Sequence, residues 1–306
     1  MTRLQDLVRA ELEAPVDPRV TSFARHVAGL FGDSARAVLF YGSCLRTTEL
    51  DGQMLDFYVI VSEYRAAYDR RWLAVANRLI PPNVFPVQHG GLQAKYAVLS
   101  ESDFARLASS RTRNVSVWAR FAQPSRLVWS RDPAAAERVT ESVSLAAPAL
   151  LEAALPMIEG EVSTLDLWRR AFALTYSAEL RAERQGRAAS VVDFDPDRYR
   201  RFAAPVLATL GIDIAVDGDE PLALGHRTGA RAARRTWARR RIEGKLLTLA
   251  RLAKASATYA GGVDYLAWKI NRHAGTEITV RPWQRRWPLL GALALLPRLL
   301  LRGAVR

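Results

Sequence analysis

Residues 38–61 read VLFYGSCLRTTELDGQMLDFYVIV, and this stretch decides the fold. Residues 35–40 and 55–61 are short apolar runs, the second rich in β-branched side chains, so each predicts a buried strand. The glycine and serine at positions 42–43 predict a tight turn directly after the first run. Asp56 lies near the start of the second run, which places a carboxylate inside an otherwise apolar strand.

Outward from this stretch, the pattern continues as a mixed α/β unit over residues 35–130. The expected elements are a helix at residues 65–79, strands at 83–87 and 93–99, and a helix that begins at Glu101 with Ser100 as its N-cap. Pro81 and Pro82 end the first helix, because proline has no amide hydrogen to continue the backbone ladder.

From residue 132 onward the pattern changes to helical spacing of apolar residues. The expected helical segments are 133–158, 165–184, one that opens at Pro196, 227–254 and 265–273. We therefore expect three regions: an α/β unit at residues 1–131, a helical region at 132–224, and a basic helical region with an apolar tail at 225–306.

The composition is that of a globular protein with an unusual charge. The 306 residues carry 44 basic and 31 acidic side chains, a formal net charge of +13, and 49% of them are hydrophobic. Such an excess favours phosphate-rich partners, which include nucleotides, nucleic acid and anionic membrane surfaces. The single cysteine, Cys44, excludes an internal disulfide and a cysteine-built zinc site, and it suits a reducing cytoplasm.

Targeting and membrane-spanning segments are not expected. The first fifteen residues mix acids and bases without an apolar core, unlike a signal peptide. The longest apolar run, residues 288–301, is shorter than the roughly 20 residues that span a bilayer, and Pro297 and Arg298 interrupt it.

The order of strand, Gly-Ser turn and strand with an acid is typical of a nucleotidyl-transfer site. Such a site cradles a triphosphate on backbone amides, and Gly42 lets phosphate approach the main chain closely. It also needs a carboxylate that binds Mg²⁺, which Asp56 would supply. Each half alone is common in ordinary structure, but their order and spacing together favour the catalytic interpretation.

Tyr58 stands where the broad nucleotidyltransferase pattern carries a second acid, since residues 56 and 58 share one face of a strand. A phenol is a poor ligand for a hard divalent cation. Either the second acid comes from elsewhere, with Glu49, Asp51 and Glu179 as candidates, or the site is degenerate.

Five blocks in the same order resemble the mitochondrial-type phosphatidate cytidylyltransferase family. They are Tyr41-Gly42-Ser43-Cys44, Leu55-Asp56-Phe57, Lys95-Tyr96-Ala97-Val98-Leu99-Ser100, Trp118-Ala119-Arg120-Phe121-Ala122-Gln123-Pro124 and Thr175-Tyr176-Ser177-Ala178-Glu179-Leu180-Arg181. This sequence departs from the family at Cys44, Ala97 and Ala119, which replace glycine, at Gln123, which replaces lysine, and at Ala178-Glu179, which replace Gly-Asp. The resemblance covers about residues 38 to 205.

The resemblance implies a reaction in which CTP and phosphatidic acid give CDP-diacylglycerol and pyrophosphate, with Mg²⁺. It implies that Tyr41, Gly42 and Ser43 hold the triphosphate, that Asp56 and Glu179 bind metal, and that Lys95, Arg120 and Arg181 meet phosphate. Each of the cations has an ordinary alternative as a solvated surface charge, and Glu179 has one as a solvated helix residue.

The C-terminal third carries features that suit binding to a phosphate-rich partner or to a lipid surface. Residues 227–241 contain seven arginines, which fit either a solvated face or a polyanion such as nucleic acid or anionic lipid. Trp283, Arg285, Arg286 and Trp287 precede the apolar tail, a combination typical of an interfacial membrane anchor. The alternative is a buried C-terminal core helix.

Together these features predict an α+β fold with a nucleotidyltransferase-like mixed sheet, a mostly helical region and a C-terminal membrane-interfacial helix. We expect a cytoplasmic enzyme that is peripheral on the inner membrane of a bacterium. The expected partners are CTP, phosphatidic acid and an anionic membrane surface, rather than nucleic acid. The alternatives are a toxin-like nucleotidyltransferase that acts on RNA or protein, and a catalytically degenerate nucleotide-binding relative.

Overall fold

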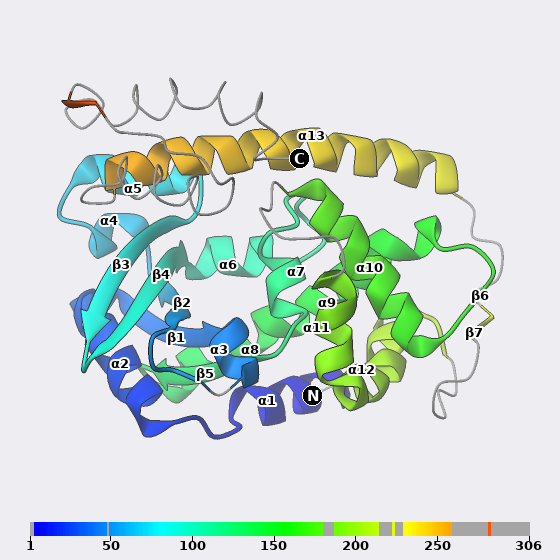
Figure 1. Ribbon diagram of the computed structural model, residues 1–306, viewed down its shortest axis with the longest axis horizontal. Helices are drawn as coiled ribbons and strands as arrows, with labels where there is room; N and C mark the ends of the chain where they lie inside the picture. The colour runs from blue at the N-terminus through cyan, green and yellow to red at the C-terminus, as the bar shows by residue number, and fades with distance from the viewer. Residues whose placement is uncertain are drawn as a thin grey trace.

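The computed structural model describes residues 3–47, 49–179, 187–213, 222–223, 229–258 and 281–282. It is an α+β protein in which helices pack on both faces of a five-stranded mixed sheet (Figure 1). The strands are β1 (Ala35–Tyr41), β2 (Met54–Val61), β3 (Asn83–His89), β4 (Leu92–Ser100) and β5 (Ser125–Ser130), in the spatial order β3-β4-β2-β1-β5. Only β2 and β4 are parallel neighbours; the other three pairs are antiparallel.

Side chains of the two central strands alternate between two apolar cores, as the period of a strand requires. In β1, Val38 and Phe40 enter one core, while Leu39 and Tyr41 enter the other. The first core lies against α2 (Pro18–Gly29), and the second is shared with the helical half of the chain. Because both faces are covered, a nearly continuous apolar sequence is what these strands need.

The remaining elements before the helical half frame this sheet. They are α1 (Arg3–Leu12), η1 (Gly32–Ser34), α3 (Ser43–Thr47), α4 (Tyr64–Ala67), α5 (Arg71–Leu79), α6 (Glu101–Leu107) and α7 (Trp118–Phe121). The predicted N-cap of α6 is confirmed, because Ser100 Oγ accepts a hydrogen bond from the Asp103 amide at 3.2 Å. The prediction of one helix over residues 65–79 was wrong at its centre, since the chain is extended at Tyr68 and divides it into α4 and α5.

The helical half contains α8 (Pro133–Ser144), α9 (Ala146–Ala154), η2 (Leu155–Met157), α10 (Thr164–Ala178), α11 (Arg187–Phe194), α12 (Pro196–Thr209) and α13 (Ala230–Thr258), with the short pair β6 (Glu161–Val162) and β7 (Leu222–Ala223). Pro196 opens α12 as predicted, behind the N-cap Asp195. The segment predicted at 133–158 is two helices and a 3₁₀ turn, because the chain turns at Leu145. The predicted boundary between residues 131 and 132 falls between β5 and α8, and the larger core is continuous across it.

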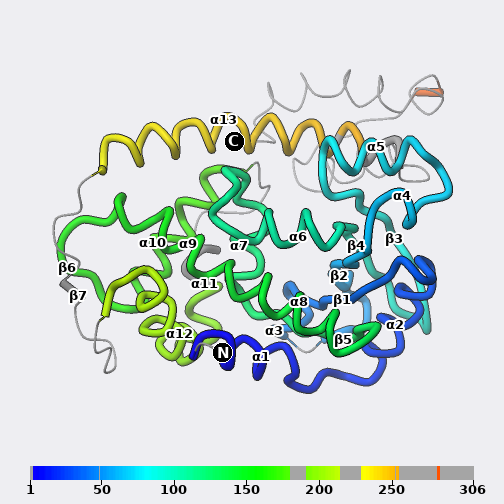
Figure 2. Tube along the Cα trace, turned by 180° about the vertical axis from the view of Figure 1, so that it is seen from behind, coloured from blue at the N-terminus to red at the C-terminus, as the bar shows by residue number. Residues whose placement is uncertain are grey.

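Helix α13 crosses the whole molecule, from the helical half to the vicinity of α5, in both the front and the back views (Figures 1 and 2). Trp237 anchors its first half, with a fully buried ring whose Nε1 donates to Ala153 O at 2.9 Å. Arg251 anchors the second half by donating to Pro81 O and to Ser116 Oγ, both at 2.8 Å. Lys254 donates to the carbonyls of Ile80 and Pro82.

Sequence patterns missed several elements of this architecture, among them β5, α7 and α11. Strand β5 has polar or charged residues at half of its positions, so its apolar content is too low for strand periodicity to predict it. The helix pair α1 and α2 was also not predicted. Within the described part of the chain, no helix is long and apolar enough to cross a membrane. The predicted helix at 265–273 and the apolar tail lie outside the described residues.

Candidate functional site

The turn after β1 brings the main chain directly against a carboxylate. Gly42 has φ +96°, a left-handed conformation that favours glycine. A Cβ at this position would lie 2.7 Å from Asp56 Oδ2, closer than side-chain carbons approach other atoms. Asp56 lies beside Gly42 because it pairs with Tyr41 in the antiparallel register of β1 and β2. Glycine therefore serves both the turn and the close approach of the acid.

Asp56 and Lys95 are neighbours across the only parallel strand pair of the sheet. Lys95 Nζ lies 3.2 Å from Asp56 Oδ1, with the lysine side chain 43% exposed and the aspartate side chain 17%. The separation is that of an ion pair, yet the buried Oδ1 has no hydrogen bond of acceptable geometry. A half-exposed pair of this kind contributes about 0–1 kcal/mol to stability. The pairing of Lys95 with Asp56 therefore adds little to the stability of the fold. Asp56 Oδ1 can still accept a bond from a ligand.

Arg120 of α7 reaches the same cavity and lies against the ring of Tyr41. Its guanidinium lies 4.9 Å from the centre of the Tyr41 ring, and its buried Nε has no hydrogen-bond partner in the described part of the chain. Burial alone would lower the pKa of Arg120, but the surrounding acidic groups, the phenol of Tyr41 foremost, raise it on balance. Since phenols are neutral at pH 7, the carboxylates of Glu179 and Asp56 supply the attraction there, and Arg120 stays charged.

The helix that carries Arg120 is held by a buried ion pair. Arg198 of α12 pairs with Glu11 of α1, with one hydrogen bond of 3.0 Å between Nη2 and Oε1. Its Nη1 also donates to Ala122 O, just after α7, at 3.1 Å. Breaking such a buried pair costs several kcal/mol. The position of Arg120 is therefore coupled to α1 and α12, two helices far apart in the sequence.

Gly42, Asp56, Lys95 and Arg120 line one polar cavity of about 280 Å³. Its wall contains six of the predicted residues, Tyr41, Gly42, Ser43, Asp56, Lys95 and Arg120, together with Arg46, Gln53, Met54, Gln123, Pro124 and Tyr176. The residues come from β1 and the turn after it, α3, β2, β4, α7 and its following loop, and α10. Segments separated by more than a hundred residues in sequence thus meet in a single cavity.

Six of the cavity residues were not among the predicted site residues, and Arg46, Tyr176 and Gln123 are three of them. Arg46 of α3 adds a third cation to the cavity wall. The sequence signal for it was its spacing of three residues from Ser43, which places both residues on one side of a helix. Tyr176 and Gln123 belong to blocks that carry the family resemblance but had no assigned role. Gln123 Nε2 donates to Ala119 O at 2.9 Å, so its amide partly caps α7.

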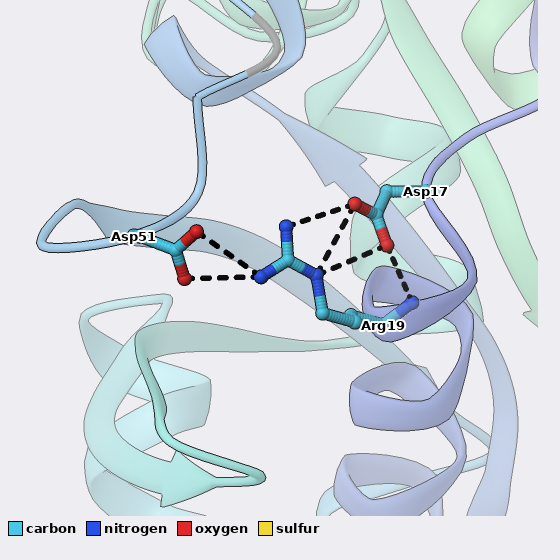
Figure 3. A network of polar contacts seen from close by, with 3 residues as sticks. All are labelled: Asp17, Arg19 and Asp51. Carbon is cyan, nitrogen blue, oxygen red and sulfur yellow. Dashed lines mark hydrogen bonds and ion pairs between the residues drawn. The ribbon is translucent and has the colours of Figure 1, made fainter.

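The candidates for a second acid are not equivalent. Asp51 does not line the cavity, and its carboxylate accepts two hydrogen bonds from Arg19, at 3.0 and 3.2 Å, beside Asp17 (Figure 3). Glu49 is exposed and does not line the cavity. Glu179 is the C-cap that directly follows α10, and its charge acts on Arg120.

Tyr58, at the position of the missing acid, is 3% exposed and packs with Tyr41 and Phe121 at ring distances of 5.3 and 5.2 Å. It belongs to the core beside the cavity and offers no oxygen to it.

A divalent cation fits this cavity in one way only. Among the described residues, no group of three or more His, Cys, Asp or Glu side chains could hold a metal ion. Among the described residues of the cavity wall, Asp56 is the one carboxylate, and its buried Oδ1 lacks a hydrogen bond. Mg²⁺ typically uses one or two carboxylates and completes its shell with substrate phosphates and water. The described residues fit such a shared site, with Asp56 as ligand, and these residues do not form a metal site by themselves.

Five predicted residues lie outside the described part of the chain. They are Arg181, proposed as a phosphate ligand, and Trp283, Arg285, Arg286 and Trp287, proposed as membrane contacts. No protein-family model matches this sequence, and a search of curated proteins finds no match.

Proposed function

We propose that this protein is a nucleotidyltransferase that transfers CMP from CTP to phosphatidic acid and releases pyrophosphate. The observation that carries the proposal is the convergence of Gly42, Asp56, Lys95 and Arg120 in one cavity. A triphosphate carries several negative charges, and the cavity offers three cations, Arg46 included, around a turn that exposes the backbone. The nucleotidyltransferase-like nature of the sheet is part of the same proposal.

The chemistry is an in-line displacement at the α-phosphorus of the nucleotide. An oxygen of the acceptor phosphate forms the new P–O bond, and the bond to the bridging oxygen of the β-phosphate breaks, so pyrophosphate leaves with that electron pair. Lys95 and Arg120 would orient the phosphates and offset the charge that develops on the leaving group. When bound, Mg²⁺ would supply further charge neutralisation between Asp56 and the phosphates.

Asp56 is the one carboxylate among the described residues of the cavity wall, and this favours a phosphate acceptor over a hydroxyl. A sugar or serine hydroxyl must lose a proton as it attacks, which requires a nearby general base. A phosphate monoester has a second pKa of about 6 and is already an anion at neutral pH. With Asp56 committed to metal and to Lys95, an ionised acceptor needs no further acid in the site.

The test is transfer of label from CTP labelled at the α-phosphate, with Mg²⁺ and phosphatidic acid in mixed micelles. The full chain is expected to form labelled CDP-diacylglycerol, and Asp56→Asn is expected to lose at least about 100-fold of the rate. Asp51→Asn is the matched control, because it removes an exposed carboxylate from the adjoining loop without touching the cavity. It is expected to stay within about threefold of wild type.

Two results would refute the proposal. Label that appears on RNA or protein, with none on lipid, would support the toxin-like alternative. Nucleotide binding without transfer to any acceptor would support a degenerate relative. Full activity of Asp56→Asn would remove Asp56 from the mechanism.

The proposed enzyme must reach a lipid substrate, so we include a peripheral location on the cytoplasmic membrane face in the proposal. The support is the sequence of the tail, with Trp283 and Trp287 around Arg285 and Arg286. Truncation after Arg281 is expected to weaken sedimentation with liposomes and to spare CTP binding. Unchanged sedimentation would refute the anchor.

A further inference from the structure

Helix α5 exposes three large apolar side chains and buries an asparagine, whereas an ordinary surface helix turns its large apolar side chains toward the core. Trp72, Val75 and Leu79, spaced to share one side of the helix, are 44%, 57% and 73% exposed. Asn77, on the other side, is 0% exposed. Together with Arg71 and Arg78 these three apolar residues make up what we call the α5 face.

The orientation of the helix is set by hydrogen bonds of Asn77. Its Nδ2 donates to Val98 O at 3.0 Å and to the Tyr68 hydroxyl at 3.1 Å, and its Oδ1 accepts from the Asn83 amide. A buried amide that lost these partners would cost about 1–3 kcal/mol. The helix therefore does not rotate to bury Trp72, and the apolar side chains remain outside.

Arginines flank the apolar residues of the α5 face. Arg71 and Arg78 are exposed, and neither forms an ion pair with a carboxylate in the described part of the chain. Residues 63–79 carry four arginines, at 65, 70, 71 and 78, against the two acids Glu63 and Asp69. The face thus combines exposed apolar side chains, one of them tryptophan, with an excess of unpaired positive charge.

A cavity of about 1110 Å³ opens beside this face. Val75, Arg71 and Arg78 belong to both the face and the cavity wall, and Arg65 adds a third cation. The wall also contains the acids Glu63, Asp69 and Asp103. Asp103 is already occupied, because it accepts from the Tyr64 hydroxyl at 2.6 Å and pairs with Arg106 at 2.6 Å. The cavity lies at the end of β2 opposite to Asp56, and so it is separate from the candidate nucleotide site.

We propose that the α5 face docks on an anionic lipid bilayer, with lipid phosphates received by Arg71 and Arg78 at the mouth of this cavity. Tryptophan and aliphatic side chains insert at the headgroup level, while arginine stems lie along apolar surface and keep their charge at the phosphates. Positive charge complements an anionic bilayer, whereas it opposes association with a second copy of this basic chain. The inference rests on α5 alone and not on the proposed reaction.

The direct test is an environment-sensitive fluorophore on Val75→Cys in the full chain. The only native cysteine, Cys44, is buried, so the label goes to the introduced thiol. Vesicles of phosphatidylcholine with phosphatidylglycerol should shift its emission to the blue, whereas vesicles of phosphatidylcholine alone should not. The matched control is Phe194→Cys, an exposed position (51%) at the end of α11, away from α5 in both views (Figures 1 and 2).

Two double variants separate the apolar contribution to vesicle binding from the charged one. Trp72→Ser with Leu79→Ser should weaken vesicle binding at any salt concentration. Arg71→Gln with Arg78→Gln should weaken it about tenfold at low salt and less at high salt. All four side chains are exposed, so unchanged thermal unfolding is the check that the fold persists.

Several results would overturn the proposal. One is a label on Val75→Cys that does not respond to anionic vesicles; another is vesicle binding that neither double variant changes. A shift that depends on protein concentration without vesicles, with a doubled molar mass, would identify the face as a contact between copies. Transfer activity on a short-chain, water-soluble phosphatidic acid is measured in parallel, so failure of docking is distinguishable from failure of the proposed reaction.

Discussion

Replacing Gly42 with alanine should displace the carboxylate of Asp56. The backbone at position 42 has φ +96°, which for an alanine costs about 1–2 kcal/mol. In addition, the new Cβ would lie 2.7 Å from Asp56 Oδ2, where ordinary contacts begin at 3.4 Å. Relief of this contact requires the carboxylate to move by about 0.7 Å, the difference of these two distances.

The expected loss of transfer rate follows from this displacement of the Asp56 carboxylate. A misplacement of about 1 Å costs on the order of 100-fold in rate, so we expect a loss of 10- to 100-fold for Gly42→Ala. Asp56 Oδ1 also faces Lys95 at 3.2 Å, and the ion pair should lengthen in the same movement. The loss should therefore appear in kcat at saturating CTP and not only in KM.

Gly52→Ala is the matched control for Gly42→Ala. Gly52 lies in the loop before β2 with φ +70°, and a Cβ there would meet no atom within 4 Å. The two variants share the backbone cost, which thermal unfolding measures, but only Gly42→Ala disturbs Asp56. If both variants lose activity equally, or if Gly42→Ala stays within about threefold of wild type, the argument that this contact positions the carboxylate is wrong.

Two further predictions concern helix α13. Gly244→Ala should destabilise the protein by about 1–3 kcal/mol, because the added Cβ would lie 2.1 Å from Ala178 O and α13 must move away from α10; chemical denaturation measures this. Lys254→Met should flatten the dependence of stability on pH between about 7 and 10.5. Burial, with a smaller contribution from Arg251, lowers the pKa of Lys254 to about 7 in the fold. The unfolded chain therefore binds more protons in that window, and wild-type stability rises with pH across it.

Each of these predictions has a control in the same chain. Gly29→Ala changes a helical glycine with no atom within 4 Å of the new Cβ, so it should be neutral or stabilising. If Gly244→Ala behaves in the same way, the close approach of α13 and α10 is wrong. Lys245→Met removes an exposed lysine of α13 and should leave the pH slope unchanged. An unchanged slope in Lys254→Met would contradict the burial argument.

Local pattern in the sequence was sufficient for much of the sheet and for several helix starts. The predicted strands at residues 35–40, 55–61, 83–87 and 93–99 are all present with boundaries within two residues. Apolar runs that enter two cores leave little choice of structure, and the N-caps Ser100 and Asp195 act on their own first turns. Patterns failed where the chain breaks a helical repeat, as at Tyr68 and Leu145, because helical spacing extends through a break that tertiary contacts impose.

The sequence by itself determined the Gly-Ser turn, the acid on the next strand and the two-sided burial of both strands, since these depend on neighbours in the chain. The tertiary structure decided which distant groups join them. Lys95 reaches Asp56 through parallel register, Arg120 and Tyr176 arrive through helix packing, and Asp51 pairs with Arg19 outside the cavity wall. Register and packing depend on how whole elements fit one another, and no local period in the chain encodes that fit.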